Sequence, residues 1–319
     1  MRDAFAAELH ELMAADQRIL LLAGDIGFKV FDRIVADCTG RFFNMGVAEA
    51  NMLGVAAGMA LSGRHPFVYT IIPFLTMRAF EQIRVDVCIQ NLPVTIVGVG
   101  GGLAYGALGP THHSIEDVAI LRSLPNMTVL VPCDPLETRL AVRAAMEHAG
   151  PVYVRLGKNG EPTLNAGEYD FRIGKAVTMR EGTDATVIAA GPVIRLALEA
   201  AERLSRDGIQ MRVLNMHTIK PIDQEAILQA AAQTRGIVTL EEHSIIGGLG
   251  SAVAEVLAEA GTGIPFLRIG IRDTFCYGVG SQEYHFKQQG LTVEAITEAV
   301  MKLLREAAAG VTMAVDRNS

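Results

Sequence analysis

Short runs of aliphatic and β-branched residues alternate with segments of helical periodicity along the first half of the chain. Such runs predict buried strands, and apolar positions that recur every three to four residues predict amphipathic helices. The predicted strands are 19–23, 67–70, 94–99, 128–131 and 152–155, and the predicted helices lie near 3–15, 48–62, 75–90, 115–122 and 135–148. This alternation favours a mainly parallel sheet that is covered by helices on both faces.

The pattern lapses between residues 157 and 184, where turn-forming and charged residues accumulate. We expect a linker over 161–184, with an edge strand at 173–179. A second α/β unit follows, with strands expected at 185–190, 211–215, 236–240 and 266–271 and helices near 193–207, 223–233, 250–260 and 292–308. The predicted fold is therefore α/β, with two mainly parallel-sheet domains at 1–160 and 185–310 and a frayed tail at 311–319.

The composition changes this picture little, but it excludes several classes of protein. The chain has 319 residues, half of them hydrophobic, with 28 Lys and Arg against 35 Asp and Glu and a net charge of −7. These values fit two folded domains and give no basic footprint for nucleic acid. The four cysteines are scattered without a C-x-x-C pair, which indicates reduced thiols in a cytoplasmic protein and no metal framework.

One long uncharged stretch raises the question of a membrane segment. No charged residue occurs from Val87 to Thr111, which is long enough on paper to cross a bilayer. The six glycines and two prolines in this stretch would break up a helix facing lipid. We therefore expect a buried strand followed by a glycine-rich loop. The amino-terminal segment has no apolar signal core, so we expect neither a membrane span nor export.

A small residue occupies every fourth position in the segment NMGVAEANMLGVAAGMALSG, residues 44–63. The residues are Gly46, Ala50, Gly54 and Gly58, and at this spacing they lie on one side of a helix. The bare face lets another backbone approach closely. It either packs tightly within the chain or meets a helix of another subunit, and the spacing alone favours neither interpretation.

Glu49 lies in the first turn of the same predicted helix, between small apolar residues. A carboxylate near a helix amino terminus is most often explained by its favourable interaction with the helix dipole. A lone acid in so apolar a setting can also be poorly solvated, and such a group can hold or share a proton. Glu49 is therefore a candidate for proton chemistry.

A second motif spans residues 100–137, where a glycine-rich loop leads into the adjacent pair His112 and His113. Glycines allow a backbone to approach a ligand closely. One of two adjacent histidines commonly faces solvent, so at most one is expected to be functional. We interpret His112 as a possible hydrogen-bonding group for a polar substrate. No cysteine or further histidine lies at ligand spacing, so a metal site is not expected.

Taken together, four segments resemble one known family. GDIGF at 24–28, GVAEANM at 46–52 and GPTHHSIEDVAILRSLPNMTVLVPCDPLE at 109–137 are similar to the pyrimidine-binding domain of the transketolase family. HTIKPID at 217–223 and VTLEEHSIIGGLGSAV at 238–253 are similar to the carboxy-terminal domain of that family. The resemblance covers essentially the whole chain in the right order.

The resemblance implies thiamine diphosphate as cofactor and the transfer of a two-carbon ketol unit from a ketose to an aldose. Glu49 matches the family glutamate that contacts the aminopyrimidine ring and promotes proton removal from the thiazolium. Phe74 and Phe80 match the aromatic pocket for that ring, with Met77 as an alternative stacking residue. Asp25 matches an acidic residue near the cofactor.

The resemblance also places the sugar substrate. Family positions that contact its hydroxyl groups and anionic tail fall on Arg2, Lys29, His112 and either Arg155 or Lys158, and the resemblance gives His112 a catalytic role as well. These cations suit a phosphate or a similarly anionic tail.

Two departures from the family pattern concern the substrate. Leu108 stands where transketolases have an aspartate that reads a substrate hydroxyl, and Gly100 stands where they have a histidine. Both losses put the standard pentose phosphate donor and acceptor pair in doubt.

A larger departure is the absence of the family's diphosphate-binding motif, G-D-G followed some residues later by asparagine. The resemblance therefore covers only the carboxy-terminal half of the enzyme. It implies a separately encoded amino-terminal subunit that holds most of the Mg²⁺ or Ca²⁺ coordination, within a heterotetramer. The alternatives are the β subunit of a 2-oxo acid dehydrogenase and a non-catalytic regulatory subunit.

Overall fold

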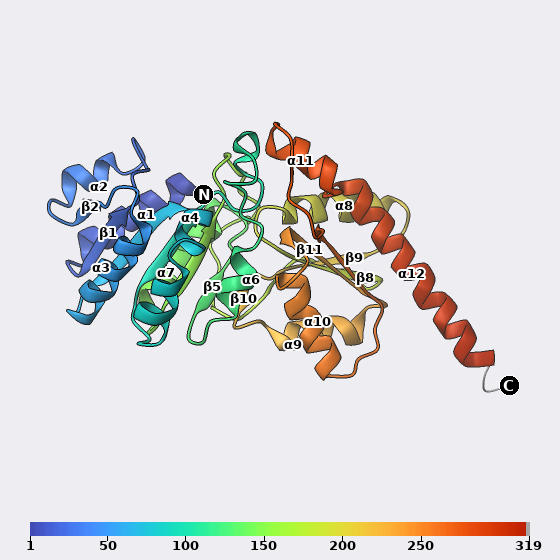
Figure 1. The fold of residues 1–319 in the computed structure, drawn as a ribbon. Helices are drawn as coiled ribbons and strands as arrows, with labels where there is room; N and C mark the ends of the chain where they lie inside the picture. Colours follow the sequence, from blue (N-terminus) through green and yellow to red (C-terminus); the bar gives the residue numbers. More distant parts are fainter. Residues whose placement is uncertain (317–319) are drawn as a thin grey trace.

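The computed structural model describes the backbone of residues 1–316 and the side chains of residues 1–308. Two α/β units lie side by side, and the last helix projects away from the second unit (Figure 1). Each unit is built on its own sheet, one of seven strands and one of five. The expected fold class, two mainly parallel-sheet domains, is confirmed.

The first sheet has the strand order β10-β5-β6-β4-β3-β1-β2, and all neighbouring pairs are parallel except β10 with β5. Its strands are β1 (Ile19–Ala23), β2 (Phe42–Asn44), β3 (His65–Ile71), β4 (Thr95–Val99), β5 (Thr128–Leu130), β6 (Val152–Leu156) and β10 (Thr218–Lys220). The strands β1, β4 and β6 are buried along their whole length. This burial on both faces explains their nearly continuous apolar sequences.

Helices cover both faces of this sheet (Figure 1). They are α1 (Arg2–Ala15), α2 (Asp32–Asp37), α3 (Glu49–Leu61), α4 (Ile72–Thr76), α5 (Phe80–Gln82), the π-helix η1 (Ile83–Cys88), the 3₁₀ turn η2 (Gly106–Leu108), α6 (Asp117–Arg122) and α7 (Pro135–Glu147). Helix α7 begins as its sequence dictates, because the Asp134 side chain accepts a hydrogen bond from the backbone N–H of Glu137 and Pro135 occupies the first turn.

The second sheet has the order β12-β11-β8-β9-β7 and is parallel apart from its edge strand β7. Its strands are β7 (Val177–Arg180), β8 (Ala185–Ala190), β9 (Met211–Asn215), β11 (Ile237–Ser244) and β12 (Phe266–Ile271). Its helices are α8 (Ile194–Arg206), α9 (Gln224–Gln233), α10 (Leu249–Glu259), α11 (Gln282–Gln289) and α12 (Val293–Asp316).

Several predicted elements need correction. The single helix expected at 75–90 is wrong, because the segment divides into α4, α5 and the π-helix η1. The short elements α2, β2, β10 and α11 were not predicted at all. The edge strand expected at 173–179 is found as β7. Helix α12 continues to Asp316, beyond the expected end at 308, and the final part of the predicted frayed tail, 317–319, lies outside the described residues.

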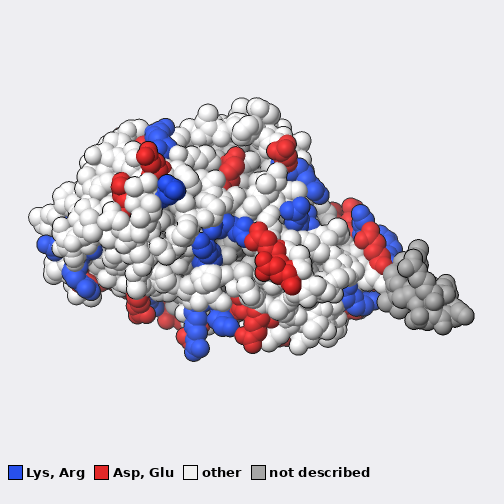
Figure 2. Space-filling view, turned by 60° about the horizontal axis from the view of Figure 1, so that its bottom comes forward, with Lys and Arg blue, Asp and Glu red and all other residues white. Residues whose placement is uncertain are grey.

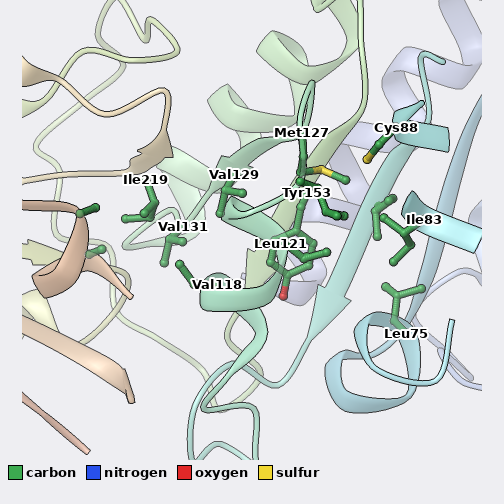
Figure 3. Packing of buried hydrophobic residues seen from close by; sticks show 14 of the residues in the cluster. Leu75, Ile83, Cys88, Val118, Leu121, Met127, Val129, Val131, Tyr153 and Ile219 are labelled. Carbon is green, nitrogen blue, oxygen red and sulfur yellow. The ribbon is translucent and has the colours of Figure 1, made fainter. Parts of the chain in front are cut away.

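The hydrophobic core continues from one unit into the other. Strand β10 belongs by sequence to the second unit, yet it pairs antiparallel with β5 of the first sheet. Its Ile219 packs beside Val129 and Val131 in the same apolar cluster as Tyr153 and Leu121 (Figure 3). Because apolar burial is the main force that stabilises a fold, this shared cluster fixes the two units against each other.

The surface carries mixed charge. On the face drawn in Figure 2, Lys and Arg side chains lie next to Asp and Glu side chains, and much of the surface is uncharged. Within the described part of the chain, no helix is long and apolar enough to cross a membrane. The four cysteines are buried and unbridged.

Candidate functional site

The candidate residues gather at the carboxyl edge of the first sheet. Asp25 follows β1, Glu49 follows β2, Phe74 follows β3, His112 follows β4 and Lys158 follows β6. Because these strands are parallel, the segments after them meet at one edge, at the top of the first unit in Figure 1. The chain order also reverses at this edge, since β1 lies between β2 and β3. Crevices at such reversal points bind ligands in open α/β sheets.

Glu49 is the first residue of α3, and its side chain is only 2% exposed. One charged partner compensates this burial: the Arg78 Nη1 donates a hydrogen bond to Glu49 Oε2 at 2.9 Å. Arg78 itself is half exposed. The carboxyl is therefore buried, as the sequence suggested, but it is not a lone acid. Arg78 was not among the sequence candidates, although it is the only charged residue in the apolar segment IIPFLTMRAF, residues 71–80.

A series of contacts through the rings of Phe74, His112 and Tyr105, called the ring series below, connects this ion pair to the substrate candidates. The Arg78 guanidinium lies 4.7 Å from the centroid of the Phe74 ring. Phe74 meets the His112 ring edge to face at 5.1 Å, and His112 lies 5.9 Å from the Tyr105 ring. The Lys158 Nζ sits 4.3 Å from the Tyr105 centroid. The structure thus brings together three of the sequence candidates with Glu49 and adds Tyr105 to them.

Tyr105 occupies the space above Gly100, one of the two positions where the sequence departs from the family. Gly100 has φ +88°, and a Cβ at this position would come within 2.0 Å of the Tyr105 ring. A side chain at 100 would therefore be strained and would force the Tyr105 ring to move. Burial raises the pKa of Tyr105, and the nearby charge of Arg2 offsets part of that rise.

The second departure, Leu108, lies in η2 and is 55% exposed. The backbone of this loop is fixed by the second unit, because His285 Nε2 of α11 lies 3.1 Å from the carbonyl oxygen of Gly106. The His285 ring also packs on the buried His113 ring at 5.1 Å. Burial lowers the pKa of His113. His113 therefore belongs to the contact between the units, and His112, its half-buried neighbour, is the one that faces the ring contacts described above.

A cleft of about 780 Å³ runs along this loop between the two units. Tyr105 and Lys158 line one side, and Gln282 and Phe286 of α11 line the other. Glu242 lies at its wall, and burial raises the pKa of that carboxyl to about 7. The Glu242 carboxylate accepts hydrogen bonds from the backbone N–H of Leu103 and from the Gln282 amide.

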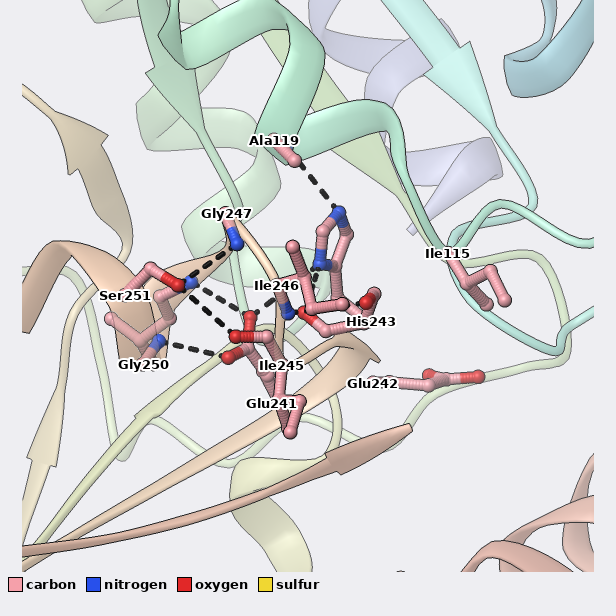
Figure 4. A network of polar contacts seen from close by, with 12 residues as sticks. Ile115, Ala119, Glu241, Glu242, His243, Ile245, Ile246, Gly247, Gly250 and Ser251 are labelled. Carbon is pink, nitrogen blue, oxygen red and sulfur yellow. Dashed lines mark hydrogen bonds and ion pairs between the residues drawn. The ribbon is translucent and has the colours of Figure 1, made fainter. Parts of the chain in front are cut away.

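The EEHS motif, residues 241–244, makes hydrogen bonds to both α/β units (Figure 4). Glu241 accepts hydrogen bonds from the backbone N–H groups of Leu249 and Gly250 at the start of α10. Glu242 points the other way, toward the first unit. His243 Nε2 receives a hydrogen bond from the backbone N–H of Ala119 in α6, at 3.4 Å. The motif therefore connects the units.

Arg155 and Lys158 were alternatives for the anionic tail, and the structure places them differently. Arg155 is 4% exposed and donates to Asp117 Oδ2 at 2.8 Å and to the carbonyl oxygens of Ser114 and Glu242. Lys158 is half buried, lies over Tyr105 and forms no ion pair with any described residue. Arg155 is thus used within the protein, whereas the Lys158 ammonium has its charge available.

The remaining candidates lie around the edge. Asp25 is exposed, has φ +53° and accepts a hydrogen bond from the Asn44 amide at 3.0 Å. Lys29 is exposed and has φ +68°, and it forms no hydrogen bond or ion pair with the described residues. Arg2 pairs with the neighbouring exposed Asp3. None of these three is in direct contact with the ring series.

The two other aromatic-pocket candidates differ from Phe74. Phe80 is half buried and packs against the apolar core of the first unit, whereas Met77 is 41% exposed. Phe74 alone is brought next to the Glu49 ion pair, through Arg78.

The set of groups at the crevice suits a flat heteroaromatic ring with a basic nitrogen. A buried carboxyl supplies a partner for such a nitrogen, and an aromatic face supplies a stacking surface. One planar guanidinium already contacts both groups. No group of three or more His, Cys, Asp or Glu side chains suited to a metal ion occurs among the described residues.

Comparison with known proteins decides the family. The family profile described as Transketolase, pyrimidine binding domain, matches residues 1–161, and the profile described as Transketolase, C-terminal domain, matches residues 174–296. The chain belongs to the transketolase family. Its two domains correspond to the carboxy-terminal subunit of a split transketolase, a transferase subunit of a thiamine-diphosphate-dependent enzyme.

Curated relatives match over nearly the full length of the chain. The 6-deoxy-6-sulfo-D-fructose transketolase subunit of Clostridium sp. (strain MSTE9) is 41% identical over 94% of this chain and 92% of that protein. An apulose-4-phosphate transketolase subunit of Phocaeicola vulgatus is 39% identical over 96% of this chain and 97% of its own. A solved structure, a split gene transketolase as an inactive beta4 tetramer, has a TM-score of 0.88 and 41% identity and covers 95% of this chain and 98% of its own.

Proposed function

We propose that this chain is the pyrimidine-binding half of a split transketolase and moves a two-carbon ketol unit from an anionic ketose to an aldose. The observation that carries the proposal is Glu49, a carboxyl that is 2% exposed at the carboxyl edge of the sheet and adjoins the Phe74 ring through Arg78. When bound, thiamine diphosphate supplies a nucleophilic carbon that cleaves the ketose next to its carbonyl group.

The residues of this chain would bind and orient the reacting groups. The buried Glu49 carboxyl would hold the aminopyrimidine ring through a hydrogen bond at a ring nitrogen and would move a proton at that atom. The Phe74 ring packs against the same heterocycle, with Met77 and Phe80 beside it. Asp25 lies at the outer edge of this pocket.

The substrate would lie along the ring series. His112 donates or accepts a hydrogen bond at a substrate hydroxyl group and holds a proton for it. Lys158 pairs with the anionic tail, with Arg2 and Lys29 adding positive charge at the rim. Leu108 covers the sugar with an apolar surface where the family has a carboxylate, so the substrate should differ from the standard pentose phosphates there. The two relatives named above act on a sulfonated and a phosphorylated ketose, which both carry such a tail.

The same proposal includes a partner. The small-residue face of α3 is open to solvent, because a Cβ at Gly54 or Gly58 would meet no atom within 4 Å. This supports a subunit contact over packing within the chain. We propose that a separately encoded amino-terminal subunit covers this face, holds the diphosphate with its Mg²⁺ or Ca²⁺, and forms a heterotetramer with two copies of each chain.

Replacement of Glu49 tests the proposed role. In the complex with the amino-terminal subunit, Glu49→Gln keeps the shape of the side chain but cannot share its proton, and we expect turnover to fall by about 10² to 10⁴. Glu81→Gln makes the same carboxyl-to-amide change at an exposed position of α5, so it is the matched control and should keep full activity. Undiminished turnover in the Glu49 variant would favour a non-catalytic regulatory subunit.

A further inference from the structure

The Lys158 ammonium is carried by an irregular segment of the chain. Residues 157–176, all of which the structure describes, contain no helix or strand. The Tyr105 ring that Lys158 contacts belongs to a second irregular segment, the loop after β4 that includes the turn η2. Because loops move more than the elements they connect, side-chain contacts decide how firmly Lys158 is held over Tyr105.

Asn159, the residue after Lys158, joins these two segments. Its Nδ2 donates a hydrogen bond to the carbonyl oxygen of Ala104 at 3.0 Å, and Ala104 directly precedes Tyr105. The same Nδ2 donates a second hydrogen bond to Gln282 Oε1 at 2.9 Å. An amide nitrogen has two N–H donors, so it can make both bonds. One side chain thus connects the Lys158 segment to the Tyr105 loop and to the second unit.

Gln282 is the first residue of α11 and lines the cleft from the side of the second unit. Its Nε2 donates a hydrogen bond to Glu242 Oε1 at 2.7 Å, and the backbone N–H of Leu103 donates to the same oxygen at 2.6 Å. Glu242 is buried on β11, so it is a fixed point of the second sheet. The Gln282 amide is therefore used at both ends, since its oxygen accepts from Asn159 and its nitrogen donates to Glu242.

Helix α11 also packs closely on the Tyr105 loop. A Cβ on Gly106 would come within 2.7 Å of the carbonyl oxygen of Gly280, just before the helix, and His285 Nε2 lies 3.1 Å from the carbonyl oxygen of Gly106. The second unit thus holds the Tyr105 loop through these contacts. Gln282 extends this hold to the segment that carries Lys158.

We propose that Gln282 is a positioning residue of the second unit, which acts through Asn159 to hold the Lys158 ammonium over Tyr105 for the anionic tail of the substrate. The inference rests on the proposed function. Gln282 acts without touching the substrate, because it orders the Lys158 segment before the tail arrives and so reduces the conformational entropy that is lost on binding. Loss of Gln282 should therefore weaken recognition of the tail and leave the chemical step unchanged.

Hydrogen exchange of the full chain measures the positioning without any substrate. Gln282→Met keeps the length of the side chain but removes both hydrogen bonds, so the backbone amides of 101–105 and 157–161 should exchange about 3- to 10-fold faster than in the parent. Gln288→Met, at an exposed position of the same helix, is the matched control and should leave both segments unchanged. Asn159→Ala breaks the same connection from an exposed position and should have the same effect, which keeps the test available if Gln282→Met does not fold.

Steady-state kinetics of the complex with the amino-terminal subunit test whether this position matters for the tail. The charged donor is D-fructose with a phosphate or a sulfonate group at C6, whichever is transferred faster, and the uncharged donor is D-fructose. Gln282→Met should raise KM for the charged donor by about 3- to 10-fold, with kcat unchanged, and should leave KM for the uncharged donor as it is. In the Lys158→Met background the same substitution should change KM by less than about twofold, because no ammonium remains to be positioned.

The outcomes separate the two proposals. Unchanged exchange in Gln282→Met, an equal rise of KM with both donors, or the full rise in the Lys158→Met background contradicts the positioning role. An unchanged KM in Lys158→Met alone contradicts the proposed tail site instead. The exchange result then still decides whether Gln282 holds the Lys158 segment.

Discussion

Lys158 contacts the ring series but forms no ion pair with a described residue, so its positive charge is available to a ligand. Its ammonium lies on the face of Tyr105, a contact worth roughly 0.5–1 kcal/mol at partly exposed sites, and it forms no ion pair within the described chain. An anionic group entering beside Tyr105 would gain a charge-assisted hydrogen bond. The side chain is therefore the best-placed determinant for the tail of the substrate.

Substitution of Lys158 should separate tail recognition from chemistry. For an anionic ketose, Lys158→Met should raise KM by about 10- to 100-fold, because a hydrogen bond to a charged group contributes about 1.5–3 kcal/mol. For the matching ketose without its anionic group, KM should stay unchanged. Steady-state kinetics with both donors and with Lys158→Arg as control measure this, and an equal loss on both donors would refute the assignment.

Arg78 and Lys158 show which residue roles the sequence reveals. Glu49 and His112 lie in segments that resemble the family, and that resemblance also implied Phe74 for the cofactor and either Arg155 or Lys158 for the substrate tail. The partner of Glu49 comes from a different segment, and a contact between residues 29 positions apart has no local signature. The buried ion pair between Arg155 and Asp117 likewise forms only when β6 and α6 pack together, so the sequence does not reveal it.

At the scale of elements, the long buried strands were predictable and the short pieces were not. Strands such as β1 and β8 are wholly buried, so their apolar runs are unambiguous. The segment 75–90 also has helical periodicity, but the chain forms a π-helix there, which no residue pattern announces. Strand β10 depends on tertiary pairing with β5 across the unit boundary.

The loop after β4 gives a prediction at this scale. Gly100 and Gly40 both have positive φ, at +88° and +74°, so an alanine at either position costs about 1–2 kcal/mol of stability. Only at Gly100 does the new Cβ collide with Tyr105, whereas at Gly40 it meets nothing within 4 Å. Thermal denaturation should thus show both variants destabilised, but only Gly100→Ala should raise the donor KM. An unchanged KM would mean that Tyr105 does not shape the substrate site.

At the scale of the whole molecule, the boundary between the units contains buried acids. Burial raises the pKa of Glu242 from 4.5 to about 7, so the folded protein keeps its proton where the unfolded chain has lost it. The stabilisation from this group is complete below about pH 4.5 and is lost as pH rises through 7. Glu241 has the same shift and direction.

Glu242→Gln isolates this contribution. The amide cannot ionise but can still accept hydrogen bonds from the Leu103 N–H and from Gln282. The Tm of the variant relative to the parent should therefore increase as pH is raised from 5 to 8. Glu259→Gln, at an exposed position on α10, should show no such trend. A constant difference for Glu242→Gln would show that the group does not titrate with folding.

The whole chain supplies a carboxyl, an aromatic face and a tail-binding cation, but no cluster of acidic and histidine side chains for a metal among the described residues. In the proposed assembly, the partner subunit holds the diphosphate with its cation and binds at the open face of α3. A screen of phosphorylated, sulfonated and branched ketoses with the assembled complex identifies the donor.

The most direct test of this account measures two-carbon transfer by the purified chain, alone and mixed with the separately expressed amino-terminal subunit, both with thiamine diphosphate and Mg²⁺. We predict no transfer by the chain alone and transfer by the mixture that saturates at equal amounts of the two chains. Transfer by the chain alone at the rate of the mixture would contradict the split-enzyme account.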